Sequence, residues 1–298
     1  MTTTSATDIY VGRDFGRHDF VITPDVVELY MGSTGDRNPI YTGASAFGGP
    51  VAPALVRHSE VYAYRDHPGA APLWYLPNLY GNLHARQQFE FFAPVMVGDA
   101  VHTRSFIAER YIKRNRQYVV NEVLYFNADD AVVARGRTHQ SFLLEDTRAG
   151  IVVDKTREKS AGRTFDVDVS AALEEIPIVR RQITPEMCWK FSGPQKNYHN
   201  DKESALKLGF PDVVVQGMLS ICLLSELMTN RYGAGWIASG KMDVNLVNIV
   251  WGSDELVCRG YVREVVPEGA RERAVLDVWA EKADGTKVTI GTASAILA

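Results

Sequence analysis

Residues 192–205 read SGPQKNYHNDKESA, and residues 213–232 read VVVQGMLSICLLSELMTNRY. The first stretch is a polar loop that carries a histidine. The second is apolar on nearly all sides for about four turns, which predicts a buried helix. Segments rich in Val, Tyr, Phe and Ile lie on both sides of these stretches, at residues 116–127, 131–144, 274–283 and 287–297. A buried helix with such segments predicts an α+β fold built on an antiparallel sheet.

An internal repeat divides the chain into two halves. Residues 22–25 (ITPD) return as residues 183–186 (ITPE), and residues 97–101 (VGDAV) return loosely as residues 251–256 (WGSDEL). Gly136 and Gly291 lie near the ends of the halves, and this match has an offset of 155 residues. In both copies of the first match a threonine precedes a proline, a pattern typical of a helix start. We expect a first half over 1–145, a linker and lead-in over 146–180, and a second half over 181–298.

Composition excludes several classes of protein. The chain has 298 residues and a formal net charge of −4, which gives no reason to expect a nucleic-acid partner. No run of about 18 apolar residues predicts a membrane span, and the N-terminus does not resemble a secretory signal, so we expect a cytoplasmic protein. The three cysteines are widely spaced, and no cluster has metal-ligand spacing, so neither disulfides nor a metal site are expected.

The two loops resemble a motif of a known family. Residues 35–41 read GDRNPIY, and residues 193–201 read GPQKNYHND, with Gln216-Gly217-Met218 at the start of the apolar helix. The MaoC-like or (R)-specific enoyl-CoA hydratase family has S-G-D-x-N-P-[IL]-H-x-D, followed by H-G-M before a helix. The resemblance runs from about Thr23 to Ala298 and is strongest to the fused form. It implies a double hotdog, in which each half is a long central helix wrapped by an antiparallel sheet.

The resemblance also implies a chemistry, the addition of water across an α,β-unsaturated thioester. Proton transfers need an acid and a base, and the thioester oxygen must be stabilised as it gains negative charge. The family uses an aspartate and a histidine for the protons and a backbone N–H at the helix start for the oxygen. Carried over by position, His199 is the acid/base residue and Gly217 supplies the N–H. No cofactor is implied beyond the CoA of the substrate.

The second half departs from the motif at the aspartate. Pro194 occupies that position, and proline cannot transfer a proton. If the loops are aligned without a gap, Asn197 falls opposite Asp36 instead. Asn197 can then orient the reaction, and Asp201 or Asp36 can supply a carboxylate.

The first half has the complementary defect. Asp36 and Asn38 match the motif, but Tyr41 takes the place of the histidine. We therefore treat Asp36, Asn38, Tyr41 and Tyr198 as secondary site candidates. Asp36 and Asn38 can equally close the loop, since these side chains bond their own backbone in turns.

An acyl pocket is expected next to the site. In fused members the degenerate half opens space for a bulky acyl tail, and residues 62–81 of this chain are rich in aromatic residues and proline. We expect Trp74, Tyr75 and Tyr80 to form pocket walls, with Gln216 at the helix start. His84, Arg86 and Gln88 follow and are expected to face solvent.

The sequence thus predicts a hydro-lyase of lipid or aromatic-acid metabolism that acts on a 2-enoyl-CoA or 3-hydroxyacyl-CoA. Two alternatives stay open. One is a different thioester reaction on the same fold, such as isomerisation or retro-aldol cleavage. The other is a non-catalytic subunit that binds acyl groups. A homodimer or higher homo-oligomer is expected in each case.

Overall fold

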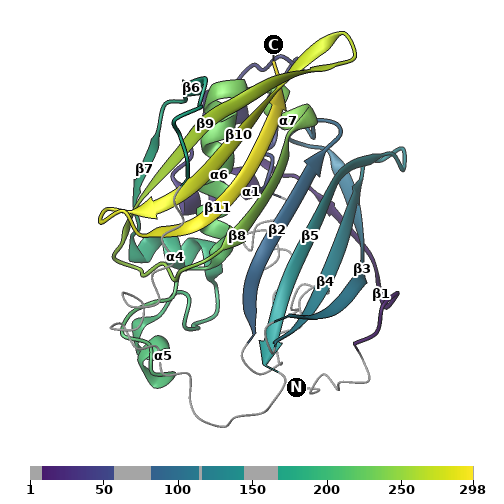
Figure 1. Cartoon of the computed structure of the whole chain (residues 1–298). Helices are drawn as coiled ribbons and strands as arrows, with labels where there is room; N and C mark the ends of the chain where they lie inside the picture. The colour runs from purple at the N-terminus through teal and green to yellow at the C-terminus, as the bar shows by residue number, and fades with distance from the viewer. Residues whose placement is uncertain (1–8, 57–81, 114–115, 144–166, 298) are drawn as a thin grey trace.

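The structure is a computed structural model, and it describes residues 9–56, 82–113, 116–143 and 167–297. Its strands form one antiparallel sheet with the order β1-β3-β4-β5-β2-β8-β11-β10-β9-β6, and β7 also pairs with β9. The two halves of this sheet meet at β2 and β8 (Figure 1). The first half contributes β1 (Asp14–Val21), β2 (Leu83–Phe91), β3 (Ala100–Lys113), β4 (Arg116–Phe126) and β5 (Val132–Leu143). The second contributes β6 (Glu174–Glu175), β7 (Val179–Gln182), β8 (Lys241–Leu246), β9 (Glu255–Glu268), β10 (Arg271–Lys282) and β11 (Lys287–Ile296).

The sequence repeat is also a structural repeat. In the first half Gly136 of β5 faces Val123 of β4, and in the second Gly291 of β11 faces Val278 of β10. Both members of the second pair lie 155 residues after their counterparts, so the sheet keeps one register across the repeat. The strand segments predicted from composition therefore occupy equivalent places. β6 and the start of β7 fall within the predicted linker.

The predicted helix starts are confirmed. Thr23 caps α1 (Pro24–Thr34) by accepting the N–H of Val26, and Thr184 caps α4 (Pro185–Ser192) by accepting the N–H of Met187. Each proline opens its helix, where a missing N–H is harmless. Three shorter helices also lie among the described residues: η2 (Pro39–Tyr41), α5 (Lys202–Lys207) and α7 (Ala234–Ser239).

The predicted apolar helix is α6 (Gly217–Tyr232), and it is buried along almost its whole length. It packs against β7, β9, β10 and β11 of the second half (Figure 1). Because its side chains are apolar all round, burial on every side is the favourable arrangement. In the first half, residues 51–56 precede the place of an equivalent helix, and the described residues there include no counterpart of α6. No helix in the described ranges combines the length and apolar character needed to span a membrane.

Candidate active site

The ends of α1 and α4 settle how the two loops align. α1 has 11 residues and α4 has 8, and each is followed by a glycine whose N–H bonds the carbonyl four residues earlier. These glycines, Gly35 and Gly193, are therefore equivalent. The three-residue difference lies in the helix and not in the loop, so Pro194 occupies the place of Asp36. The ungapped alignment, with Asn197 opposite Asp36, does not hold.

The far ends of the loops are equivalent too. The Ile40 carbonyl accepts the N–H of Val51 at 3.0 Å, and the Tyr198 carbonyl accepts the N–H of Val214 at 3.1 Å. The next residue in each loop is Tyr41 in the first half and His199 in the second. Tyr41 thus stands where the second half has its histidine.

His199 is held in one orientation by the backbone. Its Nδ1 lies 2.6 Å from the Val214 carbonyl oxygen, which can only accept, so Nδ1 carries the proton. In the neutral ring Nε2 then bears the lone pair. Burial lowers the pKa of His199 to about 4, so the ring is neutral near pH 7. The adjacent Tyr198 ring lies against it, with 3.8 Å between the ring centroids. His199 is thus a neutral, oriented base.

Asn197 fastens the loop that presents this histidine. Its Oδ1 accepts the backbone N–H of His199 at 2.8 Å. Its Nδ2 donates to the carbonyls of Ser192 and Gln195, at 3.0 and 2.9 Å. Both ends of the amide are therefore used within the loop, and Asn197 orients His199 through the backbone.

Asp201 is committed to a helix cap. It accepts the N–H and the hydroxyl of Ser204 at the start of α5, and it pairs with Lys196 at 3.0 Å. The Ser204 hydrogen bonds, with Lys196, lower the pKa of Asp201 to about 2. Within the described part of the chain, no carboxylate forms an ion pair with His199.

Gly217 opens α6, which follows this loop and the short helix α5 along the chain. The side chain of the N-cap residue, Gln216, is half-buried and makes no capping hydrogen bond. The first N–H groups of a helix have no partner within it, and the helix dipole is positive there, so this end suits a developing oxyanion. A methyl group on Gly217 would lie 2.1 Å from Cδ2 of Leu246, so the end of the Leu246 side chain would have to shift to admit any larger residue.

His84 of β2 reaches this helix end from the first half, which sequence reasoning missed. Its Nδ1 lies 3.6 Å from the point that a Gly217 Cβ would occupy. Its Nε2 lies 3.0 Å from Oε1 of Gln87, which also accepts the Thr138 hydroxyl at 2.9 Å. Burial lowers the pKa of His84 to about 4. The expectation that His84 faces solvent is therefore wrong. Its nearness to Gly217 depends on the pairing of β2 with β8, which no local pattern reveals.

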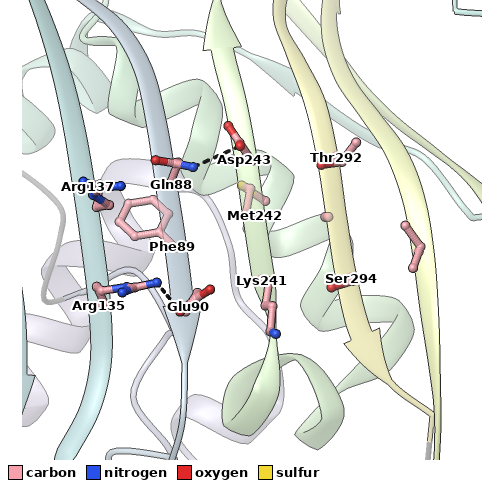
Figure 2. Close-up of a pocket in the computed structure, with 12 residues that line it drawn as sticks. Gln88, Phe89, Glu90, Arg135, Arg137, Lys241, Met242, Asp243, Thr292 and Ser294 are labelled. Atoms are coloured by element: carbon pink, nitrogen blue, oxygen red, sulfur yellow. Dashed lines mark hydrogen bonds and ion pairs between the residues drawn. The ribbon is translucent and has the colours of Figure 1, made fainter. Parts of the chain in front are cut away.

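Arg86 and Gln88 lie on the other face of the sheet, where both contact Asp243 of β8. A groove of about 250 Å³ opens on this outer face at the junction of the halves (Figure 2). Its side chains include Gln88, Glu90, Lys241 and Asp243, which alternate with the core residues Phe89 and Met242. The groove is therefore separated from His199 and Gly217 by the sheet.

The first-half candidates gather at the opposite end of α6. The Tyr41 hydroxyl donates to Oδ2 of Asp36 at 2.8 Å, and Asn38 Nδ2 donates to Asn230 Oδ1 at 3.0 Å. Asn230 lies 13 residues beyond Gly217, or about 20 Å along a helix. Asp36 and His199 are therefore not brought together, and Asp36 cannot supply the missing carboxylate.

Buried charge surrounds Asp36. Its carboxyl is 2% exposed, and burial raises its pKa. Glu226 of α6 is also buried and forms a two-point contact with Arg181 at 2.7 and 2.8 Å. Burial, with the charge of Asp36, raises the pKa of Glu226 to about 7. This cluster ties the first-half loop to α6.

The expected pocket walls and the expected absence of a metal site are the remaining predictions from the sequence. Trp74, Tyr75 and Tyr80, the expected pocket walls, lie outside the described residues. Across the described ranges, no group of three or more His, Cys, Asp and Glu side chains is arranged to hold a metal ion.

Comparison with known proteins identifies the architecture. Residues 10–135 match the family model described as FAS1-like, dehydratase domain region. No curated protein matches the sequence. A solved structure named MaoC-like dehydratase is similar over 98% of this chain and 99% of its own, at 17% identity and a TM-score of 0.74. A MaoC domain protein dehydratase from Chloroflexus aurantiacus is similar over 98% and 96%, at 15% identity and a TM-score of 0.67.

A conserved hypothetical protein from Mycobacterium tuberculosis, described as having a double hotdog fold, is similar over 97% of both chains. Its identity is 13% and its TM-score is 0.64. These likenesses confirm the double hotdog predicted from the sequence. The dehydratase-region model thus matches the first half, and the whole chain has the double hotdog fold of these structures.

Proposed function

We propose that the chain is a hydro-lyase that interconverts a 2-enoyl-CoA and a 3-hydroxyacyl-CoA at the start of α6. One observation carries the proposal. A neutral histidine, His199, is fixed by Val214, and Val214 lies three residues before the first N–H of a buried helix at Gly217. A base and an oxyanion site therefore come from one short stretch of chain, as the reaction requires.

The proposed steps use His199 for both proton transfers. In hydration, Nε2 takes a proton from water while the hydroxide adds to Cβ of the enoyl group. The electron pair of the double bond moves toward the thioester oxygen, where the Gly217 N–H and the end of α6 stabilise it. The imidazolium then returns the proton to Cα, which restores neutral His199. Dehydration runs these steps in reverse, and no cofactor takes part beyond the CoA of the substrate.

A second candidate function follows from the separation of the aspartate and the histidine of the family motif, which lie in different halves of this chain. Asp36 and His199 lie at opposite ends of α6, so neither loop has both the aspartate and the histidine at the positions of the family motif. That arrangement favours an acyl-binding subunit without turnover. The homo-oligomer expected from the sequence stays a prediction, which sedimentation of the purified protein measures.

Substitution of His199 separates the two functions. A panel of 2-enoyl-CoA and 3-hydroxyacyl-CoA thioesters is incubated with the full chain, and products are detected by mass. Because general acid–base groups contribute about 10²–10⁴-fold, His199→Gln is expected to reduce turnover by that order. His139→Gln is the matched control, since His139 is also buried but bonds Gln88 on the outer face. Undiminished turnover by His199→Gln rejects the proposed role, and thioester binding without any turnover by the native chain supports the second candidate.

A further inference from the structure

Four buried polar side chains adjoin one another on the inner face of the first-half sheet. Gln87 of β2, Asn121 of β4, and Thr138 and Gln140 of β5 are each at most 4% exposed. Thr138 faces both Asn121 and Gln87 across the strands, so the four form one cluster. Buried polar groups are unusual in a sheet core and require hydrogen-bond partners.

The same positions in the second half are apolar. There Ala293 of β11 faces Leu276 of β10 and Met242 of β8, in the same pairing as Thr138 with Asn121 and Gln87. With the offset of 155 residues, the equivalents of Gln87, Asn121, Thr138 and Gln140 are Met242, Leu276, Ala293 and Ala295. All four belong to the hydrophobic core that surrounds α6. The first half thus has polar groups where the second half packs its central helix.

Two atoms of the polar cluster lack a partner. Asn121 Nδ2 donates to Gln140 Oε1 at 3.2 Å, which uses one side of each amide. Asn121 Oδ1 and Gln140 Nε2 are buried and have no hydrogen bond to the described residues. A buried donor or acceptor without a hydrogen bond destabilises the protein, so the presence of these two atoms points to a ligand that makes the bonds. Asn121 Oδ1 can accept and Gln140 Nε2 can donate, and a hydroxyl group, which both donates and accepts, complements the two.

The polar cluster continues from the proposed reaction site. Gln140 pairs across the strands with His84, and Gln87 bonds His84 directly. His84 in turn lies against the start of α6, next to Gly217. The proposed thioester site at Gly217 therefore lies beside this polar face, on the first-half side of the helix start.

We propose that this face binds the acyl group and selects thioesters whose chain carries a neutral oxygen function, a hydroxyl or carbonyl, beyond the reacting carbons. The inference rests on the proposed function for the thioester itself. The neutral character follows from the cluster, in which Gln87, Asn121, Thr138 and Gln140 offer amides and a hydroxyl but no ionised group.

Binding of unreactive thioesters tests the selection without turnover. Pairs of saturated acyl-CoA molecules of equal length are compared by calorimetry, one plain and one with a hydroxyl moved one carbon at a time along the chain. At the matching carbon, two hydrogen bonds are expected to tighten Kd by about tenfold or more. The variant Asn121→Leu/Gln140→Ala installs the second-half residues. It is expected to bring the Kd values of the plain and the hydroxylated thioester within about twofold of each other.

The outcomes separate the two proposals. Gln88→Met, on the outer face of β2, is the control and should keep the preference. If the double variant does not fold, as judged by circular dichroism, Gln140→Ala alone carries the test. Equal binding at every hydroxyl position, tighter binding of a chain ending in a carboxylate, or a preference that survives in the variant overturns the inference. Hydroxyl preference without hydration of any enoyl-CoA overturns only the proposed function.

Discussion

The pH dependence of turnover tests His199 quantitatively. Its folded pKa is about 4, because burial disfavours the charged ring. At pH 5.5 such a group is about 97% neutral, whereas an unperturbed histidine with a pKa of about 6.5 is only about 9% neutral. If His199 is the base of the free enzyme, kcat/KM at pH 5.5 should remain within about twofold of its value at pH 7. A solvent-exposed histidine would instead lose about tenfold over the same interval.

The assay must separate titration from acid unfolding. An unfolded histidine takes its proton near 6.5 and folded His199 near 4, so stability falls as pH falls between these values. Enzyme held at each pH and then assayed at pH 7.5 shows whether a loss is reversible. Initial rates are measured with one enoyl-CoA from pH 4 to pH 8. A reversible acid limb with its midpoint between pH 6 and 7 refutes the assignment of a buried, neutral His199 as the base.

Two further predictions follow from α6. Gly217→Ala places a methyl group against Leu246, and overpacking of this kind costs about 1–3 kcal/mol, more than the helix propensity gained from alanine. We expect a lower urea midpoint, and a smaller penalty when the same change is made on a Leu246→Ala background; equal penalties would exclude the contact. Glu226 ionises near 4.5 when unfolded but keeps its proton to about 7 when folded, so its contribution to stability declines as pH rises from 4.5 to 7. That decline is on the order of 3 kcal/mol at most, and Glu226→Gln should flatten stability between pH 5 and pH 8; an unchanged slope would contradict the raised pKa.

Much of the fold was predictable from local patterns. The Thr-Pro starts at Thr23 and Thr184, the apolar run that forms α6, and the offset between Gly136 and Gly291 each reflect short-range chemistry. Helix caps, hydrophobic periodicity and repeats can be recognised in the sequence itself, without knowledge of contacts between distant residues. The double hotdog followed from these features together with the family resemblance.

The site was less predictable because it depends on contacts between distant residues. Whether Asn197 or Pro194 stands opposite Asp36 depended on where α4 ends, and the sequence allowed both. The contact of His84 with Gly217 depends on the pairing of β2 with β8, which joins the two halves. Burial also determines the pKa of His199, and the burial of a loop residue cannot be predicted from the sequence of the loop.

The loss of the carboxylate and the character of the remaining site are linked by electrostatics. An aspartate at the place of Pro194 would favour the charged form of His199 and raise its pKa. Without it, burial alone acts, and the pKa falls to about 4. In the proposed reaction, His199 would then be a weaker base but, once protonated, a stronger acid toward Cα or a leaving hydroxyl. An aspartate at position 194 would also oppose the negative charge that develops on the thioester oxygen in that reaction. We therefore expect the start of α6 at Gly217 to supply a larger share of the transition-state stabilisation than it would with an aspartate at position 194.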